Sequence, residues 1–310
     1  MSIVAGQAYK IASGCQDDSK DILREQRQTT IAGVAVVEGF GYWGGKDVRV
    51  EFHPAEVNTG LVFIRDDLPT PAKIPATVEY RIETPRRTSL VCDGTMVEMI
   101  EHVMAALYGL GICNCEVHVN QSEMPGCDGS SATFVNALDA VGIVAQNISK
   151  SRLVIHDTTR VGDKDHWIEA RPSKDGKTSL RYRLDYTNIS PAIGRQTAEF
   201  VITPDIFRQE IARCRTFMLE PEAQWLLSQG LGTRVQLTDV LVFDQQGPKE
   251  NTLRFEDECA RHKILDMVGD FALAGCDIVG HIIAHRTGHR LNAELIKALL
   301  KEGQLEEFHH

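Results

Sequence analysis

The order of apolar and polar residues divides the chain into two stretches that contain similar elements. From about residue 26 onward, short runs with β-type alternation are separated by turn residues, and helical patterns follow them. The strands predicted in this half are 29–37, 48–52, 60–64, 77–82, 89–92 and 112–119, and the helices are 95–107 and 130–141. Thr95 and Glu98 have the spacing of a capping box, which predicts where the first helix begins.

The second half repeats this order. Its predicted strands are 152–155, 167–170, 180–186, 198–202 and 279–285, and its predicted helices are 205–212, 221–229 and 255–274. The segments 105–112 and 271–278 share one helix–glycine–strand pattern. Strands grouped before helices, twice over, predict an α+β duplication. We therefore expect a loose extension at 1–25, an N-terminal domain at 26–148 and a C-terminal domain at 149–310.

Composition narrows the class of protein. The 310 residues are 43% hydrophobic and 25% charged, with a formal net charge of -10, so nucleic acid is not expected as a partner. No apolar run approaches the length of a membrane-spanning helix, so we expect no integral membrane segment. The 8 cysteines form no C-x-x-C pair, which favours a reduced, cytoplasmic compartment.

A polar stripe in the predicted helix 255–274 is the first candidate site. Glu258, His262, Asp266 and Asp270 recur every four residues beside the apolar face of this helix. A neutral imidazole at 262 and a carboxylate at 266, one helical turn apart, could bind one zinc ion. The same stripe could be a solvated helix face with a His–Asp hydrogen bond.

The corresponding helix of the first half carries a possible third ligand. His102 could project toward the other half, although a lone histidine is more often a hydrogen-bonded surface or core residue. Three protein ligands would leave one zinc position open, as a catalytic site requires, and adjacent Glu101 could then take a proton from water. His289, on a glycine turn, could be held as an imidazolium by Asp270, or it could be a simple turn residue.

Several ordered motifs resemble one known family. They are Glu101-His102, Asp128-Gly129-Ser130, Arg215-Thr216-Phe217, Leu253 to Glu258, Arg261 to Asp266, and Gly288-His289-x-Leu291-Asn292. With these motifs the chain resembles the UDP-3-O-acyl-N-acetylglucosamine deacetylases, the zinc amidases of lipid A biosynthesis. The resemblance extends from about residue 26 to 300.

The resemblance implies two similar α+β domains, each a helix layer on a β-sheet, with the active site in the cleft between them. It implies that zinc is bound by His102, His262 and Asp266. Glu101 would be the general base, and His289, supported by Asp270, would stabilise the oxyanion and protonate the leaving amine.

The same resemblance assigns the substrate contacts. Thr216 and Lys263 would hold the oxyanion and the substrate, and Arg286 stands where the family usually has a lysine near the diphosphate. Phe217 and Glu222 would also bind substrate. The expected partner is a nucleotide sugar that carries an acyl chain, and we expect a monomer.

Two segments depart from the family pattern. Residues 33–45 are longer and more aromatic than the usual loop, and within 230–239 Arg234 and Val235 replace glycine, which predicts added volume in the acyl passage. Glu222 takes the place of an expected aspartate. A divergent paralogue that deacetylates another N-acyl sugar therefore stays as an alternative, and so does a non-enzymatic protein that binds zinc or a sugar.

Overall fold

The structure is a computed structural model that describes residues 27–302 and 304–306. The extension expected at 1–25 lies outside these described residues. Within them, no helix is long and apolar enough to cross a membrane.

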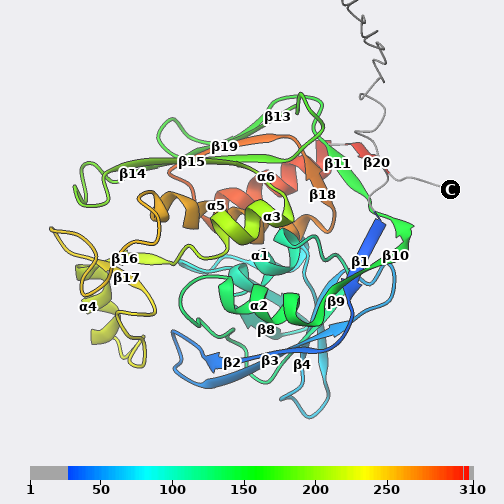
Figure 1. The fold of residues 1–310 in the computed structure, drawn as a ribbon, viewed down its shortest axis with the longest axis horizontal. Coiled ribbons are helices and arrows are strands. Elements are labelled where there is room, and N and C mark those ends of the chain that lie inside the picture. Colours follow the sequence, from blue (N-terminus) through cyan, green and yellow to red (C-terminus); the bar gives the residue numbers. More distant parts are fainter. Residues whose placement is uncertain (1–26, 303, 307–310) are drawn as a thin grey trace, which may run out of the picture.

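Two five-stranded sheets with the same strand order form the outside of the molecule (Figure 1). The N-terminal sheet has the order β2 (Ala35–Phe40), β3 (Asp47–Pro54), β9 (Cys115–Val119), β4 (Leu61–Arg65) and β5 (Ala72–Pro75). The C-terminal sheet has the order β12 (Thr159–Gly162), β13 (Trp167–Arg171), β19 (His281–His285), β14 (Ser179–Asp185) and β15 (Arg195–Val201). In each sheet only the third and fourth strands run parallel. The expected duplication of an α+β unit is confirmed.

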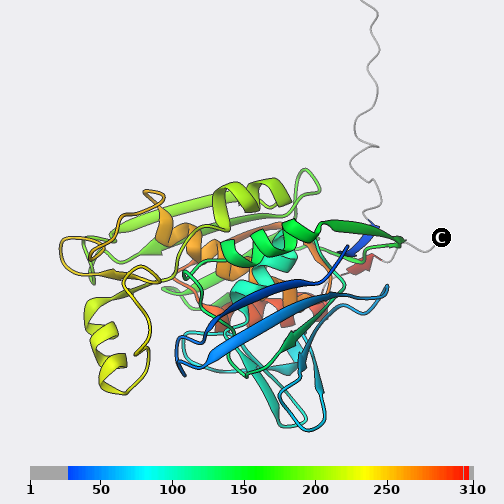
Figure 2. The ribbon, with the colours of Figure 1, turned by 60° about the horizontal axis from the view of Figure 1, so that its bottom comes forward.

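The main helices lie between the two sheets (Figures 1 and 2). α5 (Glu258–Phe271) contacts β14 and β15, and α6 (His289–Glu302) contacts β12 and β13. α2 (Ala132–Val141) contacts β2, and α1 (Glu101–Gly109) packs against both α2 and α5. The contact between α1 and α5 thus joins the two halves.

Smaller elements complete the fold. They are β1 (Arg27–Ile31) with β10 (Ile143–Ser149), β6 (Arg81–Ile82) with β7 (Ser89–Cys92) and β8 (Thr95–Glu98), β11 (Arg152–Val154) with β18 (Asp277–Val279) and β20 (Gln304–Glu306), β16 (Phe217–Leu219) with β17 (Leu241–Phe243), and the helical segments η2 (Val78–Tyr80), α3 (Pro204–Ile206), η3 (Phe207–Ile211), α4 (Glu220–Ser228) and η4 (Ala272–Ala274). α4, β16 and β17 project together at one end of the molecule (Figures 1 and 2).

Several predicted element bounds were wrong. Thr95–Glu98 is strand β8, because its backbone pairs with β7 and Met99 adopts a left-handed φ of 57° that stops any helix before α1. In the predicted strand 77–82, residues 78–80 form the helical turn η2 and only 81–82 are strand, and the predicted strand 29–37 breaks after Ile31. Helix α6 was not expected at all. The boundary near residue 148 stays a prediction.

The glycine stops at the two similar junctions are confirmed. Gly111 and Gly275 have φ of 79° and 71°, the left-handed conformation that ends a helix and that glycine adopts at little cost. The strands that follow are β9 and β18, and only β9 belongs to a five-stranded sheet.

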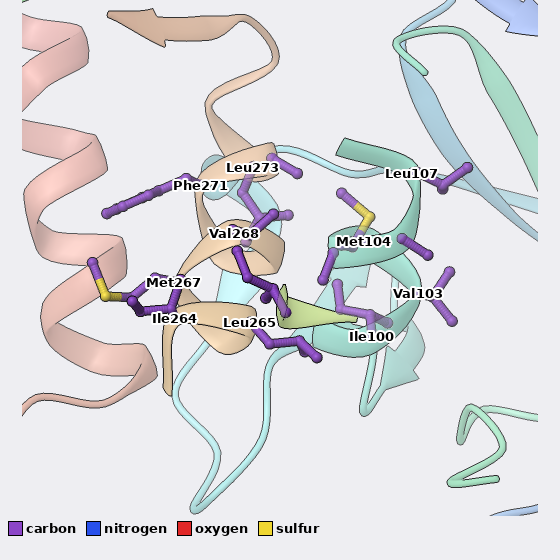
Figure 3. Packing of buried hydrophobic residues seen from close by; sticks show 14 of the residues in the cluster. Ile100, Val103, Met104, Leu107, Ile264, Leu265, Met267, Val268, Phe271 and Leu273 are labelled. Atoms are coloured by element: carbon purple, nitrogen blue, oxygen red, sulfur yellow. The ribbon is translucent and has the colours of Figure 1, made fainter. Parts of the chain in front are cut away.

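Close packing of α1 against α5 depends on one residue without a side chain. In Figure 3, Leu265 and Val268 lie on the side of α5 that faces α1, whereas Met267 and Phe271 point toward α6. A Cβ placed on Gly269 would lie 2.0 Å from the carbonyl oxygen of Glu101. Only glycine at 269 therefore permits this separation of the two helices.

We expect Gly269→Ala to lower the free energy of unfolding by about 3 kcal/mol, because the added methyl group must push α1 away from α5. Gly33→Ala is the matched control, since its Cβ would lie 3.9 Å from the nearest atom, the Cβ of Val141. Urea denaturation of both variants measures the difference. Equal stability of the two variants would contradict the close approach of these helices.

Candidate metal and catalytic site

Three side chains from the two facing helices converge. His102 lies in the first turn of α1, and His262 and Asp266 lie one turn apart on α5. The Oδ1 atom of Asp266 is 3.6 Å from His102 Nε2 and 3.4 Å from His262 Nε2, and all three residues are buried. Among the described residues this is the one group of three whose ligand atoms, within 4.8 Å of one another, could hold a metal ion.

The protonation states of these residues suit a cation. His262 Nδ1 lies 3.1 Å from the carbonyl oxygen of Cys214, which requires a proton on Nδ1 and leaves the Nε2 lone pair toward Asp266. Burial lowers the pKa of His262 to about 4, so the ring is neutral at pH 7. Burial opposes the ionisation of Asp266, but His262 and Lys263 outweigh it and hold its pKa well below the usual range. Two histidine nitrogens and one carboxylate match the donors of a catalytic zinc site.

Glu101 is the first residue of α1 and precedes His102, one of the three converging side chains. Its Oε2 accepts a hydrogen bond of 2.9 Å from the backbone N–H of Thr88. Burial raises the pKa of Glu101, although His289 and His102 partly oppose the shift. A carboxylate with a raised pKa is suited to take a proton at neutral pH.

His289 is the first residue of α6, and its Nδ1 lies 2.8 Å from Asp270 Oδ2. Burial alone would lower the pKa of His289, but Asp270 outweighs it and raises the pKa to about 9. Asp270 also accepts hydrogen bonds from the Thr88 hydroxyl, at 2.6 Å, and from the Asn292 amide, at 2.8 Å. A raised pKa favours the imidazolium form of His289 at pH 7, and this form can donate a proton.

Other predicted residues lie around the converging side chains. Lys263 Nζ donates to Asp266 Oδ2 at 2.9 Å and lies 5.8 Å from the ring centre of Phe217. Burial opposes the charge on Lys263, yet Asp266 keeps its pKa above the usual value. Thr216 is held by a 2.7 Å hydrogen bond from its N–H to the carbonyl oxygen of Gly129.

These residues line a cavity of about 870 Å³. Its polar wall contains Glu101, His102, Thr216, Glu222, His262, Lys263, Asp266, Arg286 and His289. Another part of the wall belongs to an apolar cluster that includes Tyr42, Trp43, Met99, Met218, Val235, Leu237, Val240 and Val242. The cavity can thus take a ligand with both a polar and an apolar part. Asp270 lies behind His289 and is not part of the wall.

The two departing segments contact each other. The Tyr42 hydroxyl lies 3.0 Å from the carbonyl oxygen of Asp239, and Arg234 donates to Gly45 O and to Asp47 Oδ1, both at 2.7 Å. Val235 lines the cavity, as expected. The expectation for Arg234 was wrong, because its half-exposed side chain pairs outside the cavity wall and adds no volume to it.

Glu222 has a structural partner in addition to its place in the cavity wall. Its Oε1 lies 3.0 Å from Arg86 Nη2, and its Oε2 accepts a hydrogen bond from the N–H of Leu219 before α4. Sequence reasoning missed Thr88, Cys214 and Tyr42. None of the three belongs to a ligand-like spacing, and each contacts the site through backbone atoms or a single hydroxyl.

One family model and several known proteins match most of this sequence. A model of the LpxC family, described as UDP-3-O-acyl N-acetylglycosamine deacetylase, matches residues 28–301. A UDP-3-O-acyl-N-acetylglucosamine deacetylase of Histophilus somni is 36% identical over 288 residues, which cover 91% of this chain and 92% of that protein. Proteins of the same name from Mannheimia succiniciproducens and Brucella ovis are 36% identical over 284 residues and 37% identical over 277 residues. These matches cover 91% and 89% of this chain, and 92% and 96% of the relatives.

Proposed function

The chain belongs to the UDP-3-O-acyl N-acetylglycosamine deacetylase family, and we propose that it hydrolyses the N-acetyl group of UDP-3-O-acyl-N-acetylglucosamine in lipid A biosynthesis. The products are acetate and the free amine. The observation that carries this proposal is the convergence of His102, His262 and Asp266 beside Glu101 and the Asp270–His289 pair.

We propose zinc as the metal, because two histidine nitrogens and one carboxylate are donors that zinc takes when a fourth position stays open for catalysis. His102, His262 and Asp266 would hold it. When bound, zinc supplies Lewis-acid polarisation of the amide carbonyl and a lowered pKa for water.

The remaining steps are proton transfers by residues of the chain. Glu101 takes the proton of the attacking water, since burial raises its pKa toward the working pH. The His289 imidazolium, held by Asp270, then protonates the amine as the C–N bond breaks. Lys263 and Thr216 stabilise the negative charge that develops on the carbonyl oxygen.

The cavity wall supports the substrate class. We assign the acyl chain to the apolar cluster around Val240 and Val242, and the diphosphate to Arg286, whose guanidinium can bind phosphate in a bidentate manner. Phe217 and Glu222 would lie beside the sugar. The cytoplasmic location and the monomeric state stay predictions.

The test is acetate release from UDP-N-acetylglucosamine that carries 3-O-acyl chains of several lengths, with the substrate lacking an acyl chain as control. We expect zinc-loaded protein to deacetylate at least one acylated substrate, because the apolar wall requires an apolar group. Chelator-treated protein should be inactive and should recover when zinc is restored. Zinc-loaded protein that acts on none of them would favour the paralogue specific for another N-acyl sugar.

A further inference from the structure

Thr88 contacts the proposed base and the carboxylate that holds the proposed acid, and it is not part of the cavity wall. It immediately precedes β7, is buried, and belongs to the N-terminal half. Its N–H donates to Glu101 Oε2 at 2.9 Å, and its hydroxyl donates to Asp270 Oδ1 at 2.6 Å. One residue therefore connects the proposed base on α1 to the carboxylate that supports the proposed acid on α6.

The backbone of Thr88 is itself fixed relative to α1. Its carbonyl oxygen accepts a hydrogen bond of 3.3 Å from the N–H of Ile100, the residue before Glu101. The backbone N–H and C=O groups of Thr88 thus bond to two adjacent residues at the start of α1, Glu101 and Ile100. Rotation of its hydroxyl is restricted because the β-branched side chain has few allowed rotamers.

The Thr88 hydroxyl supplies one of the hydrogen bonds to the buried carboxyl group of Asp270. Asp270 is 1% exposed, and it accepts from Thr88 on Oδ1 and from His289 and Asn292 on Oδ2. A buried carboxylate that loses a donor rotates or draws in water to replace the lost bond. Rotation of Asp270 would turn the ring of His289, because the 2.8 Å contact to Nδ1 sets the ring orientation.

We propose that Thr88 is a positioning residue that fixes Glu101 and the Asp270–His289 pair relative to each other across the two halves. It is absent from the cavity wall, and it forms hydrogen bonds with Glu101, Asp270 and Ile100. This inference rests on the proposed function, since it takes Glu101 as the base and His289 as the acid. Proton transfer depends steeply on donor–acceptor geometry, so a shift of about 1 Å costs on the order of 100-fold in rate.

Thr88→Val tests the proposal, because valine keeps the shape and the backbone N–H of threonine and removes only the hydroxyl. We expect kcat for acetate release to fall by about 10- to 100-fold, with KM changed less than about 2-fold. Thr88→Ser, which keeps the hydroxyl, should restore kcat to within about 3-fold of wild type. Bound metal should be the same in all three proteins.

A double mutant of residues 88 and 270 distinguishes a positioning role of Thr88 from a general loss of stability. On the Asp270→Ala background, Thr88→Val should reduce kcat by less than about 3-fold, since the acceptor of its hydroxyl is already absent. Thr88→Val with wild-type kcat, Thr88→Ser as slow as Thr88→Val, or independent effects of residues 88 and 270 would each overturn the proposal.

Two further results keep this test separate from the proposed function. If Thr88→Val does not fold, Thr88→Ala takes its place under the same criteria. If the wild-type protein releases no acetate, the proposed function fails and this inference fails with it. If the wild type is active and Glu101→Gln is slow while Thr88→Val is normal, the inference about Thr88 fails alone.

Discussion

Purified His262→Ala is expected to contain almost no zinc, whereas the wild-type protein should hold about one ion per chain. His262 offers a neutral Nε2, kept in that tautomer by the Cys214 carbonyl oxygen. Among the described residues the other histidine of this group is His102, which already supplies a nitrogen of its own. Acetate release should fall to the background of chelator-treated protein. Metal analysis after dialysis measures the first effect, and the deacetylation assay measures the second.

Two variants control for effects other than ligand loss. His262→Gln keeps much of the side-chain volume in this buried position, so loss of zinc in both variants assigns the effect to the missing imidazole. His118→Ala removes a histidine that pairs with Asp66 on the N-terminal sheet, and it should keep its zinc. Full zinc content in His262→Ala would contradict the ligand assignment.

Glu101→Gln is expected to lower kcat by about 10²- to 10⁴-fold, the usual contribution of a general base, with little change in KM. Glutamine keeps the length of the side chain and an oxygen that can accept the hydrogen bond from Thr88 N–H. It cannot take a proton from water. Steady-state kinetics with the preferred acylated substrate, at matched zinc content, measure this effect.

Glu98→Gln is the matched control for that variant. Glu98 lies three residues earlier in β8, and its carboxylate pairs with Arg87 at 2.7 Å outside the cavity wall. It should keep wild-type kcat. Glu101→Gln with activity within about 10-fold of wild type would show that the base is another residue.

Helix α5 and the placement of its polar residues could be predicted from the sequence because the information is local. Its apolar positions recur with a helical period, and His262, Asp266 and Asp270 lie on one polar stripe. The similar helix of the first half suggested His102 and Glu101, a glycine turn suggested His289, and the resemblance then favoured these assignments over their alternatives. The structure brings all three residues to the same cavity.

Other parts of the molecule depend on contacts that no local pattern contains. β8 was mistaken for the start of a helix because Thr95 and Glu98 have capping-box spacing, while its pairing with β7 and the left-handed Met99 decide the outcome. The role of Gly269 follows only from where α1 lies. Thr88 could not be found at all, since a threonine before a short apolar run has no distinctive spacing.

The ligands of the proposed zinc come from both sides of the contact between α1 and α5, and this has a thermodynamic consequence. Any ion held by His102, His262 and Asp266 acts as a cross-link between the two halves of the molecule. By mass action, its binding energy adds to the free energy that keeps the two helices packed. The concentration of free metal would therefore set part of the resistance of the whole fold to unfolding, and an ion required for the proposed chemistry would also stabilise the packing of the two halves.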